Sequence, residues 1–78
     1  MQLHPSPKLI ETAEMCGKIL AEKYIDEGSS PEEVKASIRA GQERILAPEC
    51  RSREDFETYL AAYLRGAGRA LGEAALLN

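Results

Sequence analysis

The chain of 78 residues has no tryptophan, and its aromatic residues make up only 5% of the sequence. A small β-sandwich or β-barrel is rich in aromatic and β-branched residues, whereas alanine and leucine, which dominate the apolar content here, favour helices. No apolar run approaches the ~20 residues that span a bilayer. The amino-terminal segment also lacks the basic and apolar regions of a signal peptide. We therefore expect one cytoplasmic, all-helical domain without a membrane anchor.

Residues that usually carry chemistry are equally scarce. Cys16 and Cys50 form no CxxC pair, and His4, the only histidine, lies in a proline-rich tail. This spacing does not match zinc ligands, and nothing fixes His4 as a catalytic base. Arg51 and Arg53 beside Cys50 leave a thiol of lowered pKa as an alternative to an ordinary loop cysteine. We expect reduced cysteines, no metal, no cofactor and no enzymatic activity.

Strong charge of one sign is also missing. The net charge is −3, and no segment is strongly basic, so nucleic acid is not a favoured partner. A DNA-binding or antitoxin-like module remains the alternative function, because Arg51 and Arg53 lie at the start of a candidate recognition helix. Glu54 and Asp55 in the same turn, however, would face the phosphates.

Capping residues, prolines and a glycine predict where the first two helices begin and end. Ser6 can cap a helix that has proline at its first position, and Gly28 can end it. The first helix is therefore predicted to cover about 7–27. Ser30-Pro31-Glu32-Glu33 is a capping box, and Pro48 ends the second helix, which covers about 31–46.

The third predicted helix covers about 53–76 and begins after Ser52, with Asp55 as a weaker capping-box acid. Residues 1–6 are expected to form a flexible tail, and residues 7–78 a single domain. A three-helix bundle, a helical hairpin and an intertwined dimer all fit this pattern.

Apolar residues recur at helical spacing in each segment and predict the buried stripes. These stripes are Leu9, Ala13, Cys16, Leu20 and Tyr24; Val34, Ile38, Gly41 and Ile45; and Phe56, Leu60, Tyr63, Ala67, Ala70, Ala74 and Leu77.

Three glycines within seven positions, Gly66, Gly68 and Gly72, are unusual inside a helix because each costs about 1 kcal/mol relative to alanine. One interpretation is a break near Gly66 and Gly68. A second is that Gly68 and Gly72, four residues apart on one face, let a neighbouring backbone approach closely. A third is that these glycines are simply tolerated on the surface.

Function is therefore expected to lie on surfaces. More apolar residues border the stripes than three short helices can cover, and an exposed apolar patch usually marks an interface. These residues are Ile19, Ile25, Leu46, Tyr59, Leu64, Leu76 and Leu77. We expect a small adaptor, inhibitor or chaperone-like protein that binds another protein and forms a homodimer through the third helix. Its size alone suggests a viral (phage) or mobile-element inhibitor of a host protein.

Five residues of the third helix are the candidate partner-binding residues. Arg65 and Arg69 could anchor an acidic partner, although Arg69 could equally pair with Glu73 one turn later. Tyr59 lies at the border of the stripe, and Gly68 and Gly72 offer the close approach.

Overall fold

The computed structural model describes the backbone of residues 4–77 and the side chains of residues 4–72. It contains three α-helices, α1 (Pro7–Asp26), α2 (Pro31–Ile45) and α3 (Arg53–Leu77), and a short 3-10 helix, η1 (Ala47–Glu49), between α2 and α3. The predicted all-α bundle is confirmed, and each predicted helix boundary is met to within one residue. No helix in this part of the chain is both long and apolar enough to cross a membrane.

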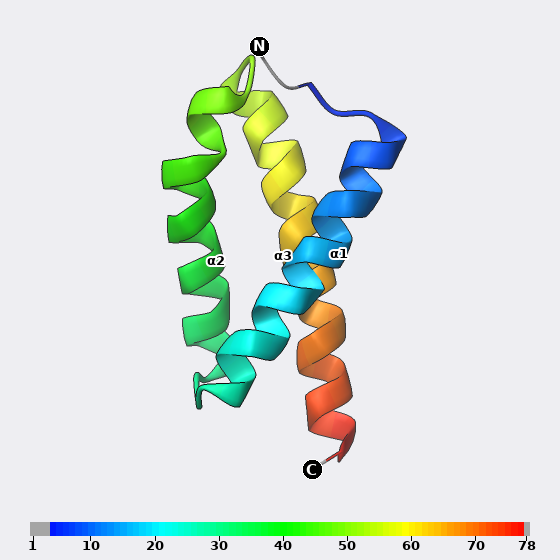
Figure 1. Cartoon of the computed structure of the whole chain (residues 1–78), viewed down its shortest axis with the longest axis vertical. Coiled ribbons are helices and arrows are strands. Elements are labelled where there is room, and N and C mark those ends of the chain that lie inside the picture. Colours follow the sequence, from blue (N-terminus) through cyan, green and yellow to red (C-terminus); the bar gives the residue numbers. More distant parts are fainter. Residues whose placement is uncertain (1–3, 78) are drawn as a thin grey trace.

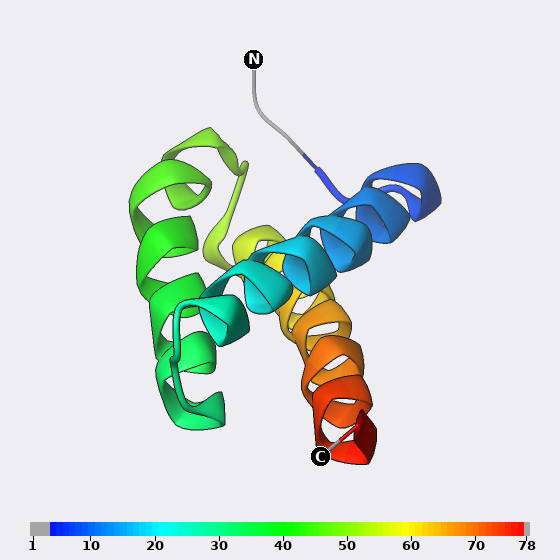
Figure 2. The same ribbon diagram turned by 60° about the horizontal axis from the view of Figure 1, so that its bottom comes forward.

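The three helices differ in how they meet. α1 crosses α3 diagonally, while α2 lies beside this pair and contacts both helices (Figures 1 and 2). The turn at Gly28, which has a positive φ of 92°, returns the chain from α1 to α2. Glycine suits this position because other residues adopt such a φ only with strain.

The serine caps form as the sequence predicts. The hydroxyl of Ser30 accepts a hydrogen bond from the backbone N–H of Glu33 (3.2 Å), and the carboxylate of Glu33 accepts one from the N–H of Ser30 (2.9 Å). These bonds lower the pKa of Glu33. Ser6 and Ser52 cap α1 and α3 by accepting from Leu9 and Asp55. The carboxylate of Asp55, expected to complete a capping box, accepts a hydrogen bond from Arg51.

α1 and α3 touch backbone to backbone at two glycines. A Cβ atom added to Gly17 would lie 2.0 Å from the carbonyl oxygen of Tyr63, and one added to Gly66 would lie 1.8 Å from that of Glu14. Such distances leave no room for any side chain. The crossing therefore requires glycine at both positions.

This contact turns the buried side of α1 away from the predicted stripe. Ala13, Gly17 and Ala21 are its buried residues, whereas Leu9 is exposed. Small residues lie inward because the helix axes come so close at Gly17. The other predicted stripe residues of α1, Cys16, Leu20 and Tyr24, lie beside the crossing and are half-buried.

The core forms around this crossing and extends to α2. Phe56 and Leu60 on α3 are fully buried, as are Val34 and Ile38 on α2. Tyr63 and Leu64 pack against both the Phe56 and the Val34 parts of the core. Ile45, predicted to face inward, is 63% exposed. It is the last residue of α2, while the next residue, Leu46, packs on the core.

Candidate interaction surfaces

Four of the five candidate partner-binding residues lie together on the exposed side of α3. We call these four, Arg65, Gly68, Arg69 and Gly72, the α3 arginine face. Tyr59, the fifth, is buried in the core, and its hydroxyl donates a hydrogen bond to the carbonyl oxygen of His4 (2.9 Å). Burial raises the pKa of Tyr59. Its role as a surface residue is therefore corrected, because the 4–6 segment and α3 enclose it.

The glycines divide differently from the prediction. α3 is continuous through Gly66, so the glycine run does not break the helix. Within the chain, close approach occurs at Gly66, while the Cβ positions of Gly68 and Gly72 have no atom within 4 Å. Gly68 and Gly72 thus leave an open strip on the surface of the part of the chain that the structure describes.

Both arginines of the face contact one carboxylate on α1. The same oxygen of Glu14, Oε2, lies 3.5 Å from Nε of Arg65 and 3.2 Å from Nη2 of Arg69. The arginine side chains are 54% and 64% exposed, and that of Glu14 is 20% exposed. The predicted alternative partner of Arg69, the side chain of Glu73, lies outside the described residues. Among the residues whose side chains the structure describes, two cations thus share one anion.

A hollow of about 280 Å³ adjoins this cluster, where α1 and α3 meet. It is lined by Glu11, Glu14, Met15, Lys18 and Arg69. The lining combines charges of both signs with one apolar side chain, Met15. It is thus suited to a partner that offers both polar and apolar groups.

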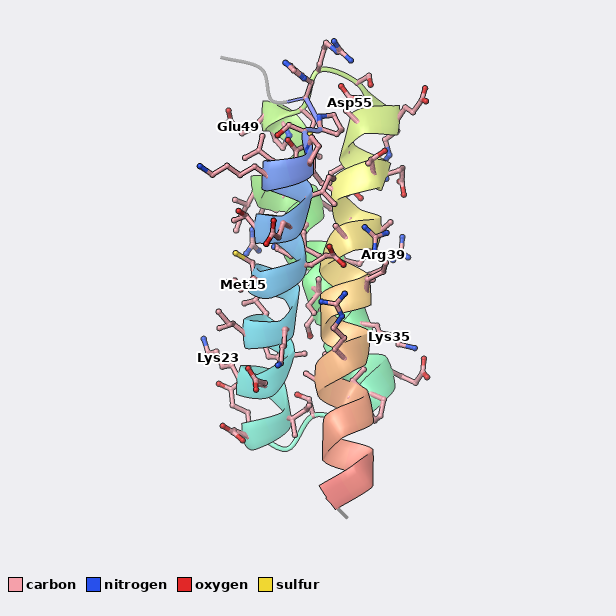
Figure 3. All side chains as sticks on the ribbon, turned by 90° about the vertical axis from the view of Figure 1, so that its right-hand side faces the viewer. Met15, Lys23, Lys35, Arg39, Glu49 and Asp55 are labelled. Carbon is pink, nitrogen blue, oxygen red and sulfur yellow. The ribbon has the colours of Figure 1, made fainter. Side chains whose placement is uncertain are left out.

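A second surface is the outward side of α1, on which the sequence pattern singled out Ile19 as an apolar residue at the border of the stripe. It lies opposite the buried Gly17, and we call it the α1 outer face. Met15 and Ile19, at its centre, are 61% and 58% exposed. Figure 3 shows Met15 and Lys23 projecting from α1 away from α3. Met15 and Ile19 are four residues apart, and this spacing alone cannot distinguish a separate exposed patch from a broader buried stripe.

The arginines of the DNA-binding alternative are engaged elsewhere. The Nε of Arg51 lies 3.1 Å from Asp55, and Arg53 contacts the carboxylates of Glu43 and Glu57. The guanidinium of Arg53 also lies over the Phe56 ring, 4.7 Å from its centroid. These contacts fasten the end of α2 to the start of α3 and neutralise both cations.

The described residues place the two thiols in different surroundings. Both cysteines are free; Cys16 is half-buried and Cys50 is buried. Burial, with smaller contributions from Asp55 and Glu49, raises the pKa of Cys50. The activated thiol considered from the sequence is thus corrected, because desolvation opposes the thiolate. No cluster of three potential metal ligands occurs among the residues that the structure describes.

Comparison of the chain with models of protein families, with curated protein sequences and with solved structures gives no significant match.

Proposed function

We propose that the chain is a small helical protein–protein interaction module that binds an acidic segment of another protein through the α3 arginine face. The observation that carries this proposal is the shared carboxylate of Glu14: among the residues that the structure describes, it is the one anion in contact with two exposed guanidiniums. Each guanidinium has five N–H donors, so most donors of Arg65 and Arg69 remain available to a carboxylate from outside.

The surroundings of the arginines support this choice of partner. Gly68 and Gly72 add no side chain between the guanidiniums and an approaching backbone. The adjoining hollow, which Met15 helps to line, offers apolar as well as polar surface beside Arg69. Arginine is also enriched among the residues that contribute most to binding energy. A partner segment with acidic residues beside a large apolar residue would satisfy both parts of this surface.

An adaptor, an inhibitor of a host protein and a chaperone-like protein all act through surfaces of this kind, and the proposal covers the three. The DNA-binding or antitoxin-like alternative gains no support from Arg51 and Arg53, because three carboxylates, those of Asp55, Glu43 and Glu57, contact these two cations. The self-association through α3 that we expected from the sequence is disfavoured, because Phe56, Leu60 and Ala67 of the predicted apolar stripe are already buried within the chain.

Selection from a random peptide library tests the proposal even though the partner is unidentified. We expect the immobilised chain to enrich peptides that combine Asp or Glu with a large apolar residue. The double substitution Arg65→Gln and Arg69→Gln should weaken their binding at least ~10-fold, since each lost charge-assisted hydrogen bond is worth about 1.5–3 kcal/mol. Isothermal titration with an enriched peptide measures this change.

The matched control is the double substitution Arg39→Gln and Arg44→Gln, which removes the same charge from exposed positions on α2. It should leave affinity within about twofold, because the two arginines lie off the proposed face. Equal losses in both double variants would show that net charge, and not this face, attracts the peptides. That result would refute the proposal.

A further inference from the structure

The arrangement of apolar and charged residues on the α1 outer face indicates which partner it binds. Eight residues compose it, and all are exposed: Lys8, Glu11, Thr12, Met15, Ile19, Glu22, Lys23 and Asp26. Two large apolar side chains lie at the centre, and charged residues lie toward both ends. Apolar side chains so exposed in the middle of a helix usually mark a contact surface.

We propose that this face binds a second copy of the chain, with the two α1 helices antiparallel. The twofold axis lies at the level of Gly17, on the opposite side of α1 from that residue. The axis follows from the pattern, because Gly17 is the midpoint between Met15 and Ile19. In this register Met15 of each copy faces Ile19 of the other. A twofold contact of this kind uses the same patch on both copies.

The charges at the ends of the helix fit this arrangement. Lys8 and Asp26 are equally distant from Gly17 and project from the same side of α1 at 3.6 residues per turn. Antiparallel packing therefore brings Lys8 of each copy to Asp26 of the other. The intervening position pairs Thr12 with Glu22.

A parallel arrangement fails the same test. It would place Lys8 against Lys8 and Asp26 against Asp26, and like charges across an interface disfavour that pairing. Among the residues that the structure describes, neither Lys8 nor Asp26 has an ion pair that would compete with the antiparallel contact. The end charges thus distinguish one direction of packing from the other.

The dimer should nevertheless be weak. Only two large apolar side chains per copy are covered, so the buried area is much smaller than the ~1,600 Å² of a standard interface. Helix geometry also brings Glu11 of one copy to the same edge of the contact as Glu22 of the other, and these like charges repel. Lys18 of both copies lies between the two Glu11–Glu22 pairs. We expect a dissociation constant on the order of 100 μM.

Sedimentation equilibrium across a concentration range that brackets this value tests the proposal. Ile19→Glu should raise the dissociation constant at least ~10-fold, because it replaces a central apolar contact with a charge. Ile45→Glu is the matched control, since Ile45 is exposed to a similar extent but lies on α2. It should leave the constant unchanged. A chain that stays monomeric throughout the range, or a dimer indifferent to Ile19→Glu, would overturn the proposal.

Charge reversal tests the direction of packing. Lys8→Asp and Asp26→Lys should each weaken the dimer several-fold, and the double variant should restore it by exchanging the partners. A parallel dimer would show no such restoration, so two weak single variants with an equally weak double variant would overturn the antiparallel register. Both substitutions place charges that suit the helix dipole, acid near the start and base near the end of α1, so α1 should remain folded.

The two proposals fail separately. The dimer tests use Ile19, Lys8 and Asp26, none of which lies in the α3 arginine face or lines its hollow. A monomer that still binds acidic peptides would overturn the dimer alone. The dimer contact would also cover Met15 and Glu11, which line the hollow, so an Ile19→Glu monomer that ignores those peptides would overturn only the proposed function.

Discussion

Single residues show how strongly burial decides chemistry in this chain. Tyr59 and Cys50 belong to the same core cluster, and burial raises the pKa of both. Neither burial could be predicted from the sequence, because each residue is enclosed by segments distant along the chain. Tyr59, for example, meets the backbone of His4. Local spacing indicates only that Tyr59 borders a stripe and that Cys50 lies between two helices.

The thiols give the prediction at this scale. In the Cys16→Ser variant, the remaining Cys50 should react with a thiol reagent at pH 8 at least ~10-fold more slowly than Cys16 does in the Cys50→Ser variant. Both lower exposure and a raised pKa reduce the accessible thiolate of Cys50. Stopped-flow absorbance with an aromatic disulfide measures both rates. Equal rates that become no faster in denaturant would contradict the burial of Cys50.

The raised pKa of Cys50 also determines how the stability of the folded chain changes with pH. The unfolded chain loses the thiol proton near the ordinary thiol pKa of about 8.5, whereas the folded chain holds it to higher pH. Stability from this group is therefore complete below about pH 8.5 and decreases as the pH rises above it. The exposed fraction of Cys50 is 8%, so this dependence belongs to a desolvated thiol.

Whole helices were the most predictable features. Ser30-Pro31 and the glutamate at position 33 are a local signal, and the capping box forms as expected. The inward side of α1 was less predictable, because Gly17 faces inward only in the presence of α3. Hydrophobicity alone favours Leu9 and Cys16 over glycine. A stripe inferred from one helix therefore misses the packing that a second helix imposes.

Capping supplies the prediction at the scale of the element. Ser30→Ala should lower the free energy of unfolding by about 1 kcal/mol, because the N–H of Glu33 loses its acceptor. Urea denaturation followed by far-UV circular dichroism measures the loss. Ser29→Ala, one residue earlier and outside the cap, should change stability by less than about 0.5 kcal/mol. A larger loss in the Ser29 variant would show that the cap does not stabilise α2.

At the scale of the whole molecule, the crossing of α1 and α3 decides which surfaces remain for partners. Backbone contact at Gly17 and Gly66 covers one side of each helix and leaves the α1 outer face and the α3 arginine face exposed. The sequence predicted all five candidate residues to lie on the surface, and four of them, the two arginines included, are exposed. It could not predict that Glu14 joins them, because that contact depends on the crossing.

The most direct test of this crossing compares two neighbouring glycines of α3. Gly66→Ala should lower the free energy of unfolding by at least about 2 kcal/mol, because the new methyl group would meet the backbone at Glu14. Gly68→Ala, with open space around it, should raise it by about 0.5–1 kcal/mol through better helix propensity. Urea denaturation of both variants beside the unmodified chain measures the difference. Opposite signs are the predicted result, and equal stability of the two variants would contradict a backbone-to-backbone crossing at Gly66.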